Sequence, residues 1–228
     1  MIDIKIIQAI VREAAELFSN RKAVRQVREK GAYDYVTAVD EAVQKYIQEK
    51  LNELYPYIQF VGEEKENKAV DLNGIVYNPF SNEMYYAEKG NGSYLNGKRI
   101  HVGTATTMGE SLISIGTSPY YKEETEENFQ MFSKIFKECQ DIRRCGAASL
   151  DLAHVVCGRI DGYMENHLKL WDYAAGTLLV REAGGEVFAY NGEKLEMEFD
   201  GNIVAGNRRI AECLIKHTAY SGYNSDTN

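Results

Sequence analysis

The sequence predicts an α/β protein in which sheets and helices are stacked in layers. Segments with apolar residues at helical spacing alternate with short β-rich segments along nearly the whole chain, without an internal repeat or a linker. Hydrophobic residues make up 44% of the 228 residues and only 3 are proline, so the chain can bury a large core. We expect two lobes, residues 1–105 and 106–218, followed by a disordered tail at residues 219–228.

The N-terminal lobe is expected to begin with two amphipathic helices. Apolar residues recur at helical spacing from residue 3 to about residue 20, and again from Thr37 to Pro56, where proline ends the pattern. An apolar strand then leads into Glu63 and Glu64. Three β-rich segments, separated by turns that contain asparagine or glycine, predict an antiparallel meander at residues 75–79, 82–90 and 92–102.

The C-terminal lobe is expected to alternate strands with helices. Strands are predicted at residues 111–118, 141–145, 160–166, 186–190 and 202–207. Helices are predicted at residues 124–139, 147–158, 171–185 and 208–220, and glycine residues end two of them.

The charge balance limits the classes of partner. With 26 basic and 34 acidic residues the formal net charge is −8, which disfavours nucleic acid or a membrane surface as a partner. A small anionic substrate remains compatible, because a bound metal ion can invert the local field. No apolar run reaches the length of a membrane span, the N-terminus lacks the pattern of a signal peptide, and the four cysteines form no CxxC pair. We therefore expect a cytoplasmic protein with reduced thiols.

Three carboxylates occur where predicted helices begin or strands end. Thr37 lies three residues before Asp40 at a helix start, a spacing that also fits a capping box. Asp172 lies in the first turn of a helix rich in small residues, where it either caps the helix, with Trp171 as a hydrophobic staple, or faces a divalent cation. Glu63 follows a strand, either as a solvated residue or as a metal ligand. The chain contains no GxSxG motif and no P-loop, so these carboxylates are the main candidates for chemistry.

Five motifs, taken in order, resemble those of the inositol monophosphatase family. They are "DYVTAVDEAV", "FVGEE", "GIVYNPFSNEMYYAEKGNGSYLNGKRI", "RRCGAASLDLAHVVCGRIDGYMEN" and "WDYAAGTLLVREAGG". The resemblance covers nearly the whole chain, to about residue 215. It implies a layered αβαβα sandwich, commonly assembled as a homodimer. It also implies a Mg²⁺-dependent, lithium-sensitive phosphatase that hydrolyses phosphate monoesters of small polyols, such as inositol 1-phosphate.

The resemblance assigns a metal-binding and catalytic role to part of these motifs. Glu63 and Asp172 correspond to metal-binding positions of the family. Asp40 corresponds to the acid near a weaker metal site, with Asp34 and Thr37 in the same neighbourhood. Glu63, Thr37 and Asp40 therefore form the expected catalytic group, and Glu63, Asp172 and Asp40 are the expected Mg²⁺ ligands.

The resemblance also assigns a substrate-binding side. Glu165 corresponds to the residue that hydrogen-bonds substrate hydroxyls, and Gly146 and Ala147 correspond to a turn that lies against the sugar ring. Ala147 replaces the hydroxyl residue that is common at its position in the family. Asp172 is expected to contribute to substrate binding as well as to the metal site.

One block of the family pattern is missing from the chain. In the family, the "GEE" motif is followed by a loop, a strand that ends in D-P-[IL]-D-G-T, and another strand. Here Gly74 leads directly into "IVYNP", and D-P-x-D-G-T occurs nowhere. The block would carry two aspartate ligands, a backbone carbonyl ligand, a threonine that helps to activate water, and two central strands of the N-terminal lobe. Activity of the shortened chain is therefore in question.

Three functional interpretations follow. The first is a phosphatase of the inositol monophosphatase type, with the missing block lost from the gene model or otherwise supplied. The second is a non-catalytic truncated paralogue that acts as a dimerising or anion-binding module. The third is a related bisphosphate nucleotidase or fructose bisphosphatase. For the first and third we expect a small phosphorylated substrate, and for none of them a nucleic-acid or membrane partner.

Overall fold

The computed structural model describes residues 3–19, 25–31, 34–57, 73–195 and 200–218. Contacts between residues divide the chain into two compact units. The first contains Met1–Asn67 and Tyr77–Glu83, and the second contains Lys68–Val76 and Met84–Asn228. Both predicted N-terminal helices are found in the first unit and the layered α/β core in the second, so the predicted mixed α/β fold is confirmed. The boundary near residue 105 stays a prediction, and the predicted tail lies outside the described residues.

The first unit is built from two helices and a hairpin. Helix α1 spans Ile4–Ala15 and continues into the short 3₁₀ helix η1, Glu16–Ser19, while α3 spans Ala38–Leu54. The Tyr46 hydroxyl on α3 donates a hydrogen bond of 2.6 Å to Glu13 on α1, which ties the two helices together. The sequence reading missed the antiparallel hairpin of β1, Val27–Gly31, and β2, Asp34–Thr37, because its polar strands lack a clear alternation.

The second unit contains a five-stranded sheet and most of a four-stranded sheet, a few residues of which fall in the first unit. The five-stranded sheet has the order β10-β11-β9-β7-β8, and β7 runs parallel to both β8 and β9. Its strands are β7, Leu112–Ile115; β8, Asp141–Arg143; β9, Gly162–Lys169; β10, Glu186–Ala189; and β11, Asp200–Gly206. The four-stranded sheet runs β3-β4-β5-β6 and is the predicted meander. It consists of β3, Asn73–Asn78; β4, Glu83–Glu88; β5, Gly92–Leu95; and β6, Lys98–Ile100.

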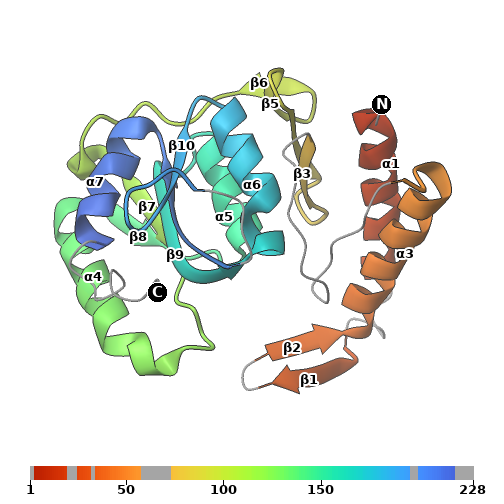
Figure 1. The fold of residues 1–228 in the computed structure, drawn as a ribbon, viewed down its shortest axis with the longest axis horizontal. Coiled ribbons are helices and arrows are strands. Elements are labelled where there is room, and N and C mark those ends of the chain that lie inside the picture. The colour runs from red at the N-terminus through yellow and green to blue at the C-terminus, as the bar shows by residue number, and fades with distance from the viewer. Residues whose placement is uncertain (1–2, 20–24, 32–33, 58–72, 196–199, 219–228) are drawn as a thin grey trace. The chain divides into compact units, whose positions relative to one another are not determined.

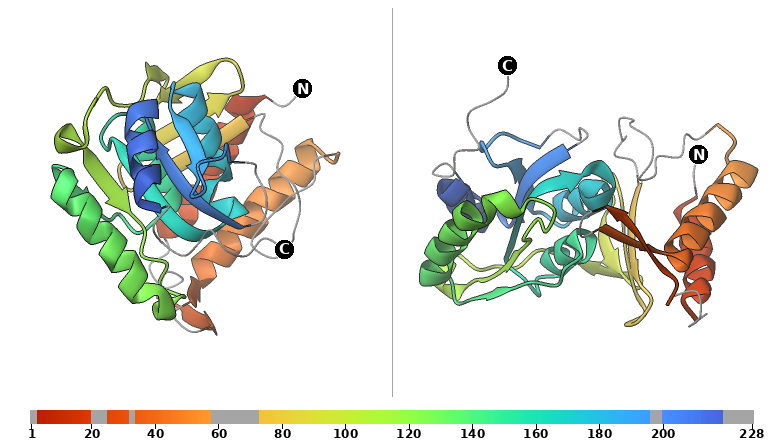
Figure 2. Two further views of the ribbon diagram at one scale, coloured as in Figure 1. Left: turned by 60° about the vertical axis from the view of Figure 1, so that its left-hand side comes forward. Right: turned by 90° about the horizontal axis from the view of Figure 1, so that it is seen from below.

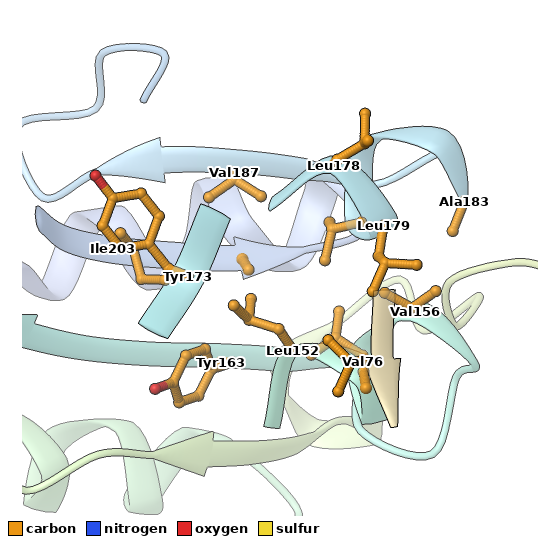
Figure 3. Packing of buried hydrophobic residues seen from close by; sticks show 14 of the residues in the cluster. Val76, Leu152, Val156, Tyr163, Tyr173, Leu178, Leu179, Ala183, Val187 and Ile203 are labelled. Atoms are coloured by element: carbon orange, nitrogen blue, oxygen red, sulfur yellow. The ribbon is translucent and has the colours of Figure 1, made fainter. Parts of the chain in front are cut away.

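Four helices cover the five-stranded sheet. They are α4, Thr125–Glu138; α5, Ala148–Val156; α6, Leu170–Glu182; and α7, Arg208–Thr218. Helices α4 and α7 lie on one face of this sheet and α5 and α6 on the other (Figures 1 and 2). The four-stranded sheet packs on the far side of α5 and α6, since Val76 and Tyr85 share a buried cluster with Leu152 and Leu179. Figure 3 shows the side chains of Val76, Leu152 and Leu179 close together in this cluster.

The small residues of α6 allow close packing against its neighbours. A Cβ atom at Gly176 would lie 2.5 Å from Cδ1 of Leu152 on α5. A Cβ atom at Gly74 on β3 would lie 2.9 Å from the backbone oxygen of Ala175. Neither position has room for a side chain, so α6 is held between α5 and the second sheet.

Gly176→Val should therefore lower the free energy of unfolding by about 1–3 kcal/mol, because the added methyl groups overlap Leu152. Urea unfolding followed by circular dichroism measures the change. Gly109→Ala is the matched control, since its Cβ atom would lie 3.9 Å from its nearest neighbour, the backbone oxygen of Glu138. Equal stabilities of the two variants would contradict the close packing of α6 on α5.

Candidate functional site

Thr37 and Asp40 form a capping box at the start of α3. Asp40 Oδ2 accepts hydrogen bonds from the Thr37 backbone N–H at 2.7 Å and from the Thr37 hydroxyl at 2.8 Å. The Asp40 backbone N–H lies 3.3 Å from Thr37 Oγ1 in return. The structural interpretation of this pair is thus confirmed. One carboxylate oxygen is committed to the cap, so a metal ion at Asp40 would have to use the other oxygen or displace the cap.

A cavity of about 440 Å³ lies beside Thr37 in the first unit. Arg25 and Arg28 line it together with Thr37 and Glu41, and Arg28 forms an ion pair with Glu41. Both side chains of that pair are more than half exposed, so the pair contributes little to stability. The lining therefore contains two arginines and one glutamate near Thr37.

In the second unit, the carboxyl ends of three neighbouring parallel strands bring predicted site residues to one edge. Strand β7 leads into Gly116 and Thr117, β8 leads into Arg144 and the Gly146 turn, and β9 carries Glu165 one residue beyond its pairing with β7. The Arg144 side chain donates from Nε to Thr117 Oγ1 at 3.1 Å and links two of these ends. Binding sites of open α/β sheets form at the carboxyl ends of parallel strands.

Glu165 packs its carboxylate directly against the backbone of Gly116. A Cβ atom at Gly116 would lie 1.8 Å from Cδ of Glu165, so any other residue at position 116 would displace the carboxylate. The Tyr163 hydroxyl donates a hydrogen bond to Glu165 Oε2. Burial raises the pKa of Glu165, the hydrogen bonds from Tyr163 and the Ser118 backbone partly offset it, and the charges of Asp151 and Asp172 raise it further.

Gly146 and Ala147 form the turn before α5. Gly146 has φ of +88°, a conformation that favours glycine, and Ala147 occupies the N-cap position of the helix. The Ala147 side chain makes no capping hydrogen bond, as expected from the absence of a hydroxyl. The turn is exposed, so a ligand at the sheet edge could approach its backbone.

Cys145, next to this turn, is unsuited to nucleophilic catalysis. Its Sγ lies 3.6 Å from Nδ1 of His154. Partial burial, together with the neighbouring Asp151 carboxylate, raises the pKa of Cys145 to about 11. The thiol therefore stays protonated at neutral pH.

Asp172 is the third residue of α6 and caps it. Its Oδ2 accepts a hydrogen bond of 2.9 Å from the Lys169 backbone N–H. The predicted role of Trp171 as a hydrophobic staple is wrong, because α6 begins at Leu170 and Trp171 lies inside the helix with 37% of its surface exposed. Strand β9 also extends to Lys169, three residues beyond the predicted end, so it leads directly into the helix that carries Asp172.

The described residues do not by themselves fit a two-metal centre. Among them, no group of three or more histidine, cysteine, aspartate or glutamate side chains is arranged to hold a metal ion. Mg²⁺ needs near-octahedral oxygen coordination. Glu63, one of the three expected ligands, lies outside the described residues, while Asp40 and Asp172 belong to different units. Convergence of these three carboxylates on one metal site stays a prediction.

Four residues around Glu165 were missed by sequence reasoning. Tyr163, Ser118 and Gly116 contact its carboxylate, and Thr117 binds Arg144. Their common signal is position: Tyr163 lies two residues before Glu165 on the same face of β9, and the others directly follow β7. Only the parallel pairing of β7 with β9 reveals that they meet.

Comparison with known proteins relates the whole chain to one family. The profile of the "Inositol monophosphatase family" matches residues 1–73 and 69–222. The chain is 34% identical to an inositol-1-monophosphatase of Rhizobium meliloti, with 92% of each chain covered. It is also 34% identical to Nus factor SuhB of Escherichia coli, with 83% of this chain and 84% of the relative covered. The solved structure of extragenic suppressor protein suhB from Bartonella henselae superimposes with a TM-score of 0.85 at 27% identity, covering 95% and 98% of the two chains.

Glu165→Gln should make the protein more stable near neutral pH. The folded-state pKa of Glu165 is raised above its unfolded value, so the protonated form contributes stability that is present below the unfolded pKa and is lost as pH rises through the folded pKa. Glutamine mimics the neutral form at every pH. The gain over the unmodified protein should thus be largest near about pH 7 and vanish below about pH 4.

Urea unfolding over this pH range measures the difference, and Glu123→Gln, which removes an exposed carboxylate, controls for a general effect of net charge. A Glu165→Gln variant that is less stable than the unmodified protein at neutral pH would show that its surroundings favour the charged carboxylate.

Proposed function

This chain belongs to the inositol monophosphatase family, and we propose that it is a phosphomonoesterase of that family for small polyol phosphates whose metal centre is interrupted. In this proposal the second unit keeps the substrate-binding side, with Glu165, Gly146 and Asp172. The D-P-x-D-G-T block, which would complete the Mg²⁺ site, is absent. The chain as it stands therefore has little or no phosphatase activity.

The observation that carries the proposal is the place where the family match divides. Its two segments, residues 1–73 and 69–222, meet where the sequence lacks the block. Strand β3 runs without a break from Asn73 to Asn78, so Gly74 and Ile75 are consecutive residues of one strand. The alignment with the Escherichia coli relative is 226 positions long, but it includes only 83% of the 228 residues of this chain. The relative therefore contains stretches that have no counterpart in this chain.

The loss is severe because it concerns the reacting centre. Two-metal phosphoryl hydrolysis requires a clamp on the attacking and leaving oxygens and a metal-activated water. Misplacement of catalytic groups by about 1 Å can reduce the rate about 100-fold. The described residues supply too few oxygen donors to rebuild this clamp.

The chemistry of Glu165 suits a ligand with hydroxyl groups. Glu165 lies at the same end of the parallel strands as the Gly146 turn, and a charged carboxylate accepts hydrogen bonds from hydroxyls. The raised pKa of Glu165 increases the fraction of neutral carboxyl, which can also donate. Both forms can therefore bind a polyol.

Several properties follow from the family and stay predictions for this chain. They are dependence on Mg²⁺, inhibition by Li⁺, assembly as a homodimer and a cytoplasmic location. Among the described residues, no helix combines the length and hydropathy that crossing a bilayer requires. The expected absence of a nucleic-acid partner has no support from the comparisons, because several relatives are named as a Nus factor. Those names also favour the second candidate function, a non-catalytic binding module.

The 228-residue chain should show no Mg²⁺-dependent release of phosphate from inositol monophosphate above background. Insertion of a family-type D-P-x-D-G-T block with its flanking strands between Gly74 and Ile75 should restore activity, and Li⁺ should inhibit it. A tenfold gain in rate corresponds to about 1.36 kcal/mol of regained transition-state stabilisation.

Two outcomes would change this proposal. Robust, Li⁺-sensitive turnover by the short chain would mean that other acids, such as Glu64, Glu66 or Asp71, have replaced the missing ligands. An inactive but folded repaired chain would favour the non-catalytic module. Circular dichroism of both chains separates misfolding from lack of chemistry.

In the repaired chain, Glu165→Gln should weaken turnover of inositol monophosphate much more than turnover of an aryl phosphate that has no hydroxyl groups. The amide cannot accept from hydroxyls as strongly as a carboxylate. Comparison of kcat/KM for the two substrates measures the difference, and Glu123→Gln again serves as the control. Equal losses for both substrates would remove Glu165 from the substrate role.

A further inference from the structure

Two residues that flank Glu165 in space hold an unusual backbone conformation. Among the described residues other than glycine, φ is positive at Asn82, Asn96, Ser118 and His167. Asparagine and histidine are enriched in this conformation, but it stays uncommon for every residue other than glycine, and serine adopts it at a cost. Ser118 has φ of +42°, and His167, two residues after Glu165 on β9, has φ of +57°. Such conformations persist only where surrounding contacts enforce them.

Those contacts converge on Glu124, which ends the short 3₁₀ helix η3, Lys122–Glu124. Its two carboxylate oxygens lie 2.8 and 2.9 Å from Nε2 of His167. The side-chain amide of Asn166 donates to Glu124 Oε2 at 2.9 Å. One carboxylate therefore binds two consecutive residues of β9. The His167 ring also stacks on Tyr121, with centroids 3.7 Å apart and an interplanar angle of 16°.

Ser118 bonds to Asn166, the residue that Glu124 also binds. Its hydroxyl lies within hydrogen-bonding distance of the Asn166 backbone oxygen, at 2.7 Å, and of the Asn166 side-chain oxygen. The Tyr121 backbone N–H donates to the Ser118 backbone oxygen at 3.0 Å. Ser118 and Asn166 are each at most 4% exposed, so these polar groups depend on one another for hydrogen bonds.

The segment that contains Gly116 and Ser118 lies against the carboxylate of Glu165, the candidate substrate-binding group. Gly116 donates its backbone N–H to the Met164 oxygen at 2.9 Å and packs beneath Glu165. The Ser118 backbone N–H acts on the same carboxylate. Within this segment, Gly116 is fixed by strand pairing. Ser118 is fixed by its contacts with Asn166, and through these contacts by Glu124 and His167.

We propose that Glu124 is a positioning residue for Glu165: through Asn166 and His167 it holds Ser118 against that carboxylate. This inference rests on the proposed role of Glu165 in binding substrate hydroxyls. Glu124 touches no reacting group. It determines substrate preference by fixing the carboxylate that a polyol would contact, because affinity from hydrogen bonds depends on groups that are already ordered.

The first test uses the 228-residue chain and amide hydrogen exchange by NMR. Glu124→Ala should speed exchange of the Ser118 and Tyr121 amides by at least about tenfold, because their segment opens locally. The Gly116 amide, which belongs to the pairing of β7 with β9, should keep its protection. Glu123→Ala removes an exposed carboxylate one residue away in η3 and should change none of these amides.

A second variant guards against loss of the fold. His167→Gly removes the imidazole but suits a positive φ, so the chain should fold and still show faster exchange at Ser118 and Tyr121. Unchanged exchange at these two amides in both Glu124→Ala and His167→Gly would overturn the proposal. Uniformly faster exchange that includes Gly116 would also overturn it, since Glu124 would then support the whole sheet edge.

The second test uses the repaired chain and separates this inference from the proposed function. Glu124→Ala should raise KM for inositol monophosphate several-fold with kcat little changed, and leave KM for an aryl phosphate unaltered. Glu124→Gln, which keeps one oxygen acceptor, should recover part of the loss. If the Ser118 and Tyr121 amides are released but the two substrates respond equally, the substrate role of Glu165 fails while the positioning contact stands.

Discussion

The close approach of α6 to its neighbours is the constraint on which the second unit depends. Gly176 leaves no space for a side chain against Leu152, and Gly74 leaves none against the backbone of Ala175. The Ser93 hydroxyl of the four-stranded sheet donates to the Leu179 oxygen of α6 at 2.6 Å, which satisfies two buried polar groups. Because the first turn of α6 carries Asp172, the packing that joins the two sheets also fixes this carboxylate at the end of β9.

Much of the fold could be predicted from the sequence, because most elements carry a local signal. The helices from Thr37 to Leu54 and from Arg208 to Thr218 have clear apolar periodicity, and the meander has turn residues at each bend. The hairpin of β1 and β2 escaped prediction because the sequences of its strands, VREKG and DYVT, show no clear apolar alternation. The helix start at Leu170 was placed one residue late, since Trp171 and Asp172 resemble an N-terminal cap wherever the helix begins.

The candidate site, like the fold, could be predicted from the sequence only in part. The motifs place Asp172, Glu165 and Gly146 in or next to elements that the sequence predicts, and their roles in a site stay predictions. The contacts around Glu165 were beyond sequence reasoning, because Glu124 and His167 are 43 positions apart and meet only through the parallel pairing of β7 with β9. The positive φ of Ser118 also has no sequence signal, because serine is not among the residues enriched in this conformation.

The absent block affects the two sides of the site differently. Glu165, Gly116 and Gly146 are held by the five-stranded sheet and its helices, whose buried cluster includes Tyr163, Leu152 and Ile203. None of these contacts needs the strands that the chain lacks. The metal clamp does need them, since its ligands would come from the block itself. Under the proposed function, the chain would lose the chemistry and keep the fold and an ordered surface for a polyol, because the residues that stabilise a fold and those that react are largely separate sets.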